Sequence, residues 1–267
     1  MSNIQSKFRR MGAEVTIRNM TRESFREYQS PLAIDIVNHG GVEVFDIEKS
    51  RGVDLNIPDV QPRDRHLVLR AENSVGALDF LCGHDEMHWF VAALPIGEAV
   101  STVTDAKEAL KPDLVKRKEA RKRRTKGDVY VRQGEWFFLP RPHASIERDA
   151  ILRDAKLVRG SGSTPHICEF MYLDGEREFE CDRYPKLVFS EAEYHELLKT
   201  RRKAKRWNWR PLRFEPDRYV KGWITHPDHN PMYLDIWHRV EMNTEQQDAT
   251  STLGQPRHRI ARVRYLD

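Results

Sequence analysis

Residues 66–94, which read HLVLRAENSVGALDFLCGHDEMHWFVAAL, decide the fold class of this chain. They contain three short runs of β-branched or alternating apolar residues, at 66–70, 77–81 and 88–94, separated by turn residues. This pattern predicts a β-meander or a small barrel. Runs at 14–18, 33–37 and 42–47 extend it toward the N-terminus, so we predict an N-terminal β-rich half over residues 1–100.

A break in composition follows this half. Asp105 with Glu108 three residues later resembles a helix capping box, and Pro112 suits the first turn of a further helix over residues 113–124. Lysine and arginine dominate that second helix. We therefore predict a basic helical connector over residues 101–127.

Strand patterns resume beyond the connector. Two hairpins are expected, one across Gln133-Gly134 and one that joins 167–173 to 176–180. Ser190 with Glu193 is a capping box that predicts a helix reaching about residue 205. Later strands are predicted at 219–225, 232–234 and 237–242.

These patterns together predict a strand-rich α+β fold. Residues 128–245 are expected to form a C-terminal α+β half, packed closely against the N-terminal half and joined to it by the basic connector. Residues 246–267 begin as a polar stretch poor in apolar side chains and end in a basic segment, which predicts a linker and a basic tail.

The composition narrows the functional classes. The 267 residues are 39% apolar and 32% charged, contain no window of about 18 apolar residues, and begin without the apolar run of a secretory signal. We therefore expect a cytoplasmic protein with no membrane partner. Three cysteines without a C-x-x-C pair exclude both a disulfide framework and a four-thiolate zinc site.

Two basic clusters are candidates for binding nucleic acid, although the formal net charge is only +4. The first ends the connector helix and consists of Arg121, Lys122, Arg123 and Arg124. The second, within residues 201–210, interleaves cations with tryptophans and consists of Arg201, Arg202, Lys205, Arg206, Trp207, Trp209 and Arg210. Guanidinium and ammonium groups neutralise phosphates, and indoles stack on unpaired bases.

A different interpretation of these clusters stays open. The cations can form a solvated helix face, with Trp207 and Trp209 anchoring the helix end in the core. They can equally meet an acidic protein partner in a larger assembly.

Two histidine segments are candidates for metal chemistry. In the first, His84 and His88 would share a helix face as in an H-E-x-x-H zinc motif, but Gly83 and the β-forming residues after His88 favour a turn that leads into a strand. The second is the turn at residues 226–231, followed by His238. Its candidate ligands for zinc or a similar ion are His226, Asp228, His229 and His238, with His143 or His166 as additions.

These histidines also have a purely structural interpretation, in which each is hydrogen-bonded in a turn or lies on the surface.

The preferred functional hypothesis is a non-catalytic or accessory protein that binds RNA or DNA through the basic clusters. The alternative is a metal-dependent hydrolase with the 226–229 turn as its site and His84, Asp85 or Glu86 as ligand or general base. A third possibility is a structural subunit of a protein assembly. Whether the chain is an enzyme stays open.

Overall fold

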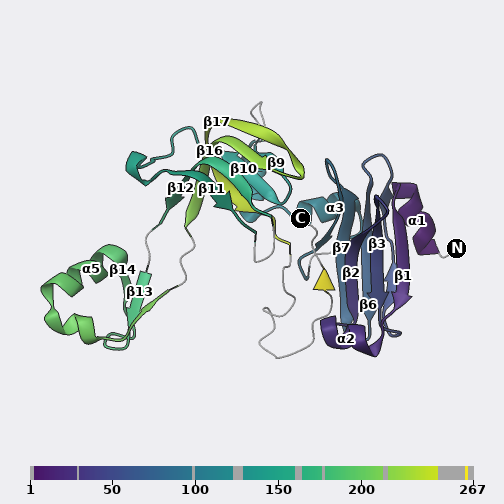
Figure 1. The fold of residues 1–267 in the computed structure, drawn as a ribbon, viewed down its shortest axis with the longest axis horizontal. Coiled ribbons are helices and arrows are strands. Elements are labelled where there is room, and N and C mark those ends of the chain that lie inside the picture. The colour runs from purple at the N-terminus through teal and green to yellow at the C-terminus, as the bar shows by residue number, and fades with distance from the viewer. Residues whose placement is uncertain are drawn as a thin grey trace.

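The computed structural model of the protein describes residues 3–28, 30–97, 100–122, 129–159, 164–175, 178–212, 216–245 and 262–263. Strands in several sheets dominate this part of the chain and helices are few, so the predicted strand-rich α+β composition is confirmed. Figure 1 shows three parts: an N-terminal body that carries α1 to α3, a sheet that contains β16 and β17, and a smaller body with β13, β14 and α5.

Two sheets pack face to face in the N-terminal body. The first has the spatial order β1 (Glu14–Asn19), β3 (Val42–Lys49), β2 (Leu32–His39) and β18 (Arg262–Val263). The second has the order β4 (Asp54–Asn56), β6 (His66–Asn73), β7 (Gly76–His84) and β8 (Trp89–Ala93), with β5 (Val60–Gln61) also paired to β6. The six strands expected here from the sequence are all present.

The alternation of apolar side chains explains how these sheets pack. Phe45 of β3 contacts Trp89 edge-on, with ring centroids 5.6 Å apart, and Phe8 of α1 (Asn3–Met11) packs on Phe45. Leu67 and Leu69 of β6 face this same core. The intervening Val68 faces the opposite side of the sheet, which α3 covers. A short helix, α2 (Arg22–Tyr28), lies between β1 and β2 in the chain.

The segment expected as a connector contains two helices that belong to different bodies. Helix α3 (Val103–Ala109) packs its buried residues on the second N-terminal sheet. Helix α4 (Asp113–Lys122) places Val115 against Phe137 and Leu139 of the C-terminal sheet. The crossing between the bodies is therefore the short turn between these helices.

The start of α3 differs from the predicted capping box. Thr102 is the N-cap: its hydroxyl accepts the Asp105 backbone N–H, and the Asp105 carboxylate accepts the Thr102 backbone N–H. Beginning the helix at Val103 places Val103, Ala106 and Ala109 on one buried face. This burial favours Thr102 and Asp105 over the predicted pair Asp105 and Glu108.

The C-terminal body is a six-stranded antiparallel sheet with a core on one face. Its order is β11 (Leu152–Leu157), β12 (His166–Asp174), β16 (Asp217–His226), β17 (His229–Met242), β10 (Trp136–Pro140) and β9 (Val131–Gln133). Buried side chains on the core face include Phe138, Met171, Ile224 and Val240. Two predicted strands, 232–234 and 237–242, are parts of one strand, because β17 continues through an irregularity in its register with β16.

The predicted hairpin between 167–173 and 176–180 is wrong. Both edges of β12 are occupied, one by β11 and the other by β16, so no edge remains for the next segment of chain. Residues 178–211 instead form the small body, with strands β13 (Glu178–Cys181), β14 (Val188–Ser190) and β15 (Trp209–Pro211). We call this body the insertion, because it lies in sequence between β12 and β16. Figure 1 shows it apart from the six-stranded sheet.

The helix of the insertion begins as predicted. In α5 (Glu191–Thr200), Ser190 and Glu193 make the expected reciprocal capping box. The α-helix ends at Thr200, earlier than the predicted residue 205, and a 3₁₀ helix, η2 (Arg202–Arg206), follows. A second 3₁₀ helix, η1 (Arg148–Ala150), precedes β11. Among the described residues, no helix has the length and apolar character needed to cross a membrane.

Candidate metal centre

Three imidazoles gather at one end of the six-stranded sheet. His166 begins β12, His226 ends β16 and His229 begins β17. Adjacent antiparallel strands place the start of one beside the end of the next. One ring nitrogen from each histidine lies within 4.8 Å of the others. The sheet topology therefore assembles a set of metal-ligand atoms from two segments about 60 residues apart in sequence.

The rings lie in a stack. The centroids of His166 and His226 are 4.3 Å apart with 24° between their planes, and the His226 and His229 centroids are 5.0 Å apart. Trp136 contacts His166 edge-on at 6.5 Å. His166 and His226 are buried and His229 is half-buried, so the stack is largely shielded from water.

Two of the ring nitrogens are buried without a partner. Nε2 of His166 and Nδ1 of His229 make no hydrogen bond with any described residue. Buried polar atoms in folded proteins are nearly always hydrogen-bonded, and an exception calls for an explanation such as a bound ion or water. Both nitrogens are therefore available to a bound ion or water.

The third histidine is held by the backbone. The Asp228 N–H donates to Nδ1 of His226 at 3.2 Å, and Nε2–H of His226 donates to the Thr164 carbonyl oxygen at 3.2 Å. One Asp228 carboxylate oxygen also lies 3.8 Å from Nδ1 of His226. Asp228 therefore places a carboxylate beside the imidazole cluster.

Burial keeps one of these imidazoles neutral. The pKa of His166 is lowered from 6.5 to about 3, mainly because burial disfavours the charged ring and also because of its neighbours His226 and His229. His166 therefore does not carry a proton on both nitrogens near pH 7. A neutral imidazole is the form that binds a metal.

This pKa predicts a loss of stability in acid. Between pH 6.5 and about 3 the unfolded chain binds a proton at His166 that the folded chain does not, so the unfolding free energy falls as pH falls. The contribution lost between pH 7 and pH 4.5 is about 2–3 kcal/mol. Urea unfolding with a chelator present measures it, and His166→Gln should show a correspondingly flatter profile. An equal acid sensitivity in both proteins would contradict the assignment.

The cluster opens into a cleft of about 560 Å³ between the two large bodies. Its lining from the N-terminal body includes His66, His84, Glu86 and His88. Its lining from the C-terminal body includes Gln133, Gly134, Asp228 and the histidines of the turn, His226 and His229. Sites for small ligands commonly lie in clefts of this size between domains.

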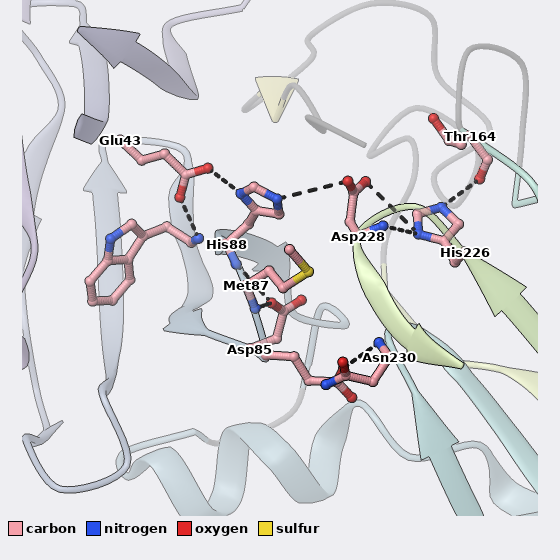
Figure 2. Close-up of polar contacts among 10 residues, drawn as sticks. Glu43, Asp85, Met87, His88, Thr164, His226, Asp228 and Asn230 are labelled. Carbon is pink, nitrogen blue, oxygen red and sulfur yellow. Dashed lines mark hydrogen bonds and ion pairs between the residues drawn. The ribbon is translucent and has the colours of Figure 1, made fainter. Parts of the chain in front are cut away.

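A chain of polar contacts crosses the cleft, as Figure 2 shows. The carboxylate of Glu43 on β3 accepts Nδ1–H of His88 at 2.5 Å and the Trp89 backbone N–H at 2.9 Å. Nε2 of His88 lies 3.8 Å from an Asp228 carboxylate oxygen. Glu86 adds a second crossing, because its carboxylate accepts the Asn230 backbone N–H at 2.8 Å. The turn before β8 is thereby joined to the turn between β16 and β17.

The predicted metal ligands divide into two groups. His226, Asp228 and His229 lie together, and His166 completes the cluster. His238 does not join it: Nδ1 faces the Ile236 carbonyl oxygen, and burial lowers its pKa. His238 pairs with Val220 along β17, away from the strand ends that carry the cluster.

The histidines of the first segment also do not converge as a zinc motif. His84 ends β7, packs edge-on against Trp89 and places Nδ1 2.6 Å from the Asp85 carbonyl oxygen. His88 contacts Glu43 instead. The Asp85 carboxylate caps the turn by accepting the backbone N–H groups of Met87 and His88. The turn inferred from Gly83 is confirmed. The role of Glu43 was missed, because its 45-residue separation from His88 leaves no local pattern.

The two basic clusters lie on different bodies. Arg121 and Lys122 end α4 beside the six-stranded sheet, and Arg123 and Arg124 fall outside the described residues. The second cluster lies in the insertion, where its cations Arg201, Arg202, Lys205, Arg206 and Arg210 are exposed. Trp207 and Trp209 are half-buried, with centroids 5.7 Å apart, and pack on Tyr184 and Tyr194 respectively. The two indoles thus form part of the insertion's aromatic core.

None of the protein-family models, curated proteins and solved structures compared with this chain matches it. The function is therefore inferred from the site itself.

Proposed function

We propose that His166, His226 and His229 bind a divalent transition metal such as zinc, and that the protein is a metal-dependent hydrolase. The observation that carries this proposal is the approach of three ring nitrogens to within 4.8 Å at the wall of a cleft. Three imidazoles are a known ligand set for catalytic zinc, and they leave a fourth position for water.

Metal binding requires the three rings to reorient, because stacked imidazoles with planes 23–38° apart do not direct their nitrogen lone pairs at one point. Nitrogen ligands bound to zinc at about 2.0–2.1 Å in a tetrahedron lie about 3.4 Å apart. The nitrogens of the cluster must therefore approach one another by about an ångström. Binding through Nδ1 of His226 would replace its 3.2 Å bond from the Asp228 N–H and keep the bond from Nε2–H to Thr164. Such a bond from the second ring nitrogen is a common support for metal-bound histidine.

The cleft also offers a proton acceptor. A metal of this kind lowers the pKa of bound water so that hydroxide forms near neutral pH. His88 lies across the cleft with Nδ1 held by Glu43 and Nε2 directed toward Asp228. A carboxylate that fixes one imidazole nitrogen leaves the other as a general base. We assign that role to His88, with Glu43 as its positioning residue.

Metal analysis and hydrolysis assays test the proposal. The purified protein should contain about one equivalent of metal, or take up zinc or cobalt with a dissociation constant in the micromolar range or below. Cobalt bound by three nitrogens should give visible absorption that shifts in His229→Ala. Hydrolysis of generic carboxylic and phosphate esters should disappear with chelator and return with zinc. No uptake at millimolar metal would overturn the metal site, and uptake without hydrolysis would leave a structural or sensory metal.

A glycine beside the cluster gives a matched test. Gly134 has a φ of +53°, and a Cβ there would lie 2.9 Å from Nε2 of His229. Gly40 has a φ of +63°, but a Cβ there would meet nothing within 4 Å. Alanine costs about 1 kcal/mol of backbone strain at both positions, but only Gly134→Ala displaces a ligand. We expect it to weaken zinc binding roughly 10- to 100-fold, the range for residues that orient ligands. Equal affinities in isothermal titration of the two variants would contradict this.

The second candidate function is nucleic-acid binding through the insertion. It is supported by the exposed cations of the 201–210 cluster, none of which makes an ion pair with the described residues. Concentrated positive charge favours binding of a polyanion. Charge reversal of Arg201, Arg202 and Arg206 should abolish salt-sensitive binding of labelled duplex oligonucleotides. If the native chain binds no oligonucleotide at low salt but retains an acidic protein, the cluster serves a protein partner.

A further inference from the structure

A group of exposed aromatic side chains lies on the six-stranded sheet, on the face opposite its core. Trp223 of β16 and Tyr233 of β17 are directly paired in the register, and their ring centroids are 5.2 Å apart. Trp223 is 51% exposed and Tyr233 is 58% exposed. Contiguous exposed apolar surface on a folded protein often marks an interaction site.

The strand register extends this surface across four strands. Lys221 of β16 pairs with Phe170 of β12, which pairs with Arg153 of β11. Three residues further along β11 and β12, beyond the register shift between Cys168 and Phe170, Thr225 pairs with Ile167 and Ile167 with Lys156. The register of β16 is irregular here, but positions 220, 222 and 224 are buried and 221, 223 and 225 are not, so Trp223 lies on the same face as Lys221 and Thr225. We call Phe170, Trp223 and Tyr233, with the cations Arg153, Lys156 and Lys221, the aromatic platform.

The face of the six-stranded sheet opposite the platform carries its packed core, so the platform is not the face that forms the core. Val220, Ile224 and Leu234 alternate with the platform residues and are buried in the core of the sheet. Helix α4 packs on the platform side at Phe137 and Leu139 of β10, toward the other end of the strand order. The platform therefore remains open in the part of the chain that the structure describes.

The positive charges of the platform favour an anionic ligand. The guanidinium of Arg153 lies over the Phe170 ring, 5.1 Å from its centroid, and Lys156 and Lys221 flank the aromatic rings. Three carboxylates lie close to platform residues in the strands: exposed Asp154 between Arg153 and Lys156, Glu169, which accepts the Trp223 backbone N–H at 2.9 Å, and Asp235, two residues after Tyr233. Aromatic faces for stacking beside cations for phosphates are the combination that sheets use to bind single strands. A neutral sugar would use the rings and leave the cations without a role.

We propose that the aromatic platform binds single-stranded nucleic acid, with bases stacked on Trp223 and Tyr233 and phosphates held by Arg153, Lys156 and Lys221. This surface shares no residue with the metal site or with the 201–210 cluster. The proposal therefore stands or falls separately from both.

The test is binding of labelled single-stranded DNA and RNA of about 15 nucleotides to the full chain. Trp223→Ala with Tyr233→Ala should weaken binding roughly 10- to 100-fold, because each stacked base contributes substantially to affinity. Phe25→Ala on α2 removes another exposed aromatic residue and is the matched control. Arg153→Ala with Lys156→Ala should lower the slope of log affinity against log salt by about 0.7 for each phosphate released.

The binding measurements on these variants can support or overturn the proposal. Binding that is lost in the platform variant, and kept in the Phe25→Ala and 201–210 charge-reversal variants, supports the proposal. Binding that survives in the platform variant, or that is absent in the native chain at low salt, overturns it. Binding of a neutral oligosaccharide in place of nucleic acid overturns it also. Trp223 and Tyr233 are both more than half exposed, and an unchanged far-ultraviolet circular dichroism spectrum verifies that the variant is folded.

Discussion

Replacing His229 with alanine should lower the affinity for zinc by more than about 100-fold. Removing residues that merely orient a metal ligand costs about 10- to 100-fold, and His229 is one of only three imidazoles in the cluster. Its Nδ1 has no hydrogen-bond partner among the described residues, so the variant breaks no internal bond at that atom. Competition with a chromophoric chelator measures the change.

The control for this experiment is His143→Ala. His143 is exposed and lies outside the cluster, so its replacement should leave zinc affinity within about twofold of the native value. If the two variants lose affinity equally, zinc binds at surface histidines and the proposed centre is wrong. Hydrolysis should follow the same order, absent in His229→Ala and retained in His143→Ala.

Replacing Phe138 with alanine should lower the unfolding free energy by about 3–5 kcal/mol, the usual cost of removing a fully buried phenylalanine. Phe138 has no exposed surface and pairs with Val240 of β17 within the core of the six-stranded sheet. Urea unfolding followed by far-ultraviolet circular dichroism measures the change. Because β17 also carries His229, the variant should lose zinc affinity at urea concentrations that leave the native chain loaded.

Val131→Ala is the matched comparison on the same sheet. Val131 pairs with Phe138 across β9 and β10, but it is 40% exposed at the sheet edge. Its replacement should change the unfolding free energy by no more than about 0.5 kcal/mol. A loss below about 1 kcal/mol for Phe138→Ala would mean that this face of the sheet is not a packed core.

The strands of the N-terminal body follow from local sequence, because each is a short apolar run bounded by turn residues. The turn at Gly40 and Gly41 has positive φ at both residues, a conformation that glycine favours. Ser190 and Glu193 likewise begin α5 through contacts only three residues apart. Such features involve neighbours in sequence, so patterns of a few residues predict them.

Strand partners were predicted less well. The segment after Asp174-Gly175 looked like the second strand of a hairpin, but β16, more than 40 residues later, occupies that edge of β12. The choice between two possible partners depends on which one buries more apolar surface, and a local pattern does not contain that comparison. The same reason explains why α3 and α4 were predicted as one connector. Each helix packs on a different sheet, and a local pattern does not show which sheet that is.

The sequence by itself determined the strand-rich class, most strand positions and the grouping of His226, Asp228 and His229, because one turn holds those three residues. Only the tertiary structure decided that His166 joins them, that Glu43 and His88 face them across a cleft, and that Trp223 and Tyr233 share an open face with Arg153. Those groupings require particular strands to be neighbours in a particular register. Strand order and register are set by packing over the whole chain, so residues distant in sequence form a site only after the fold is complete.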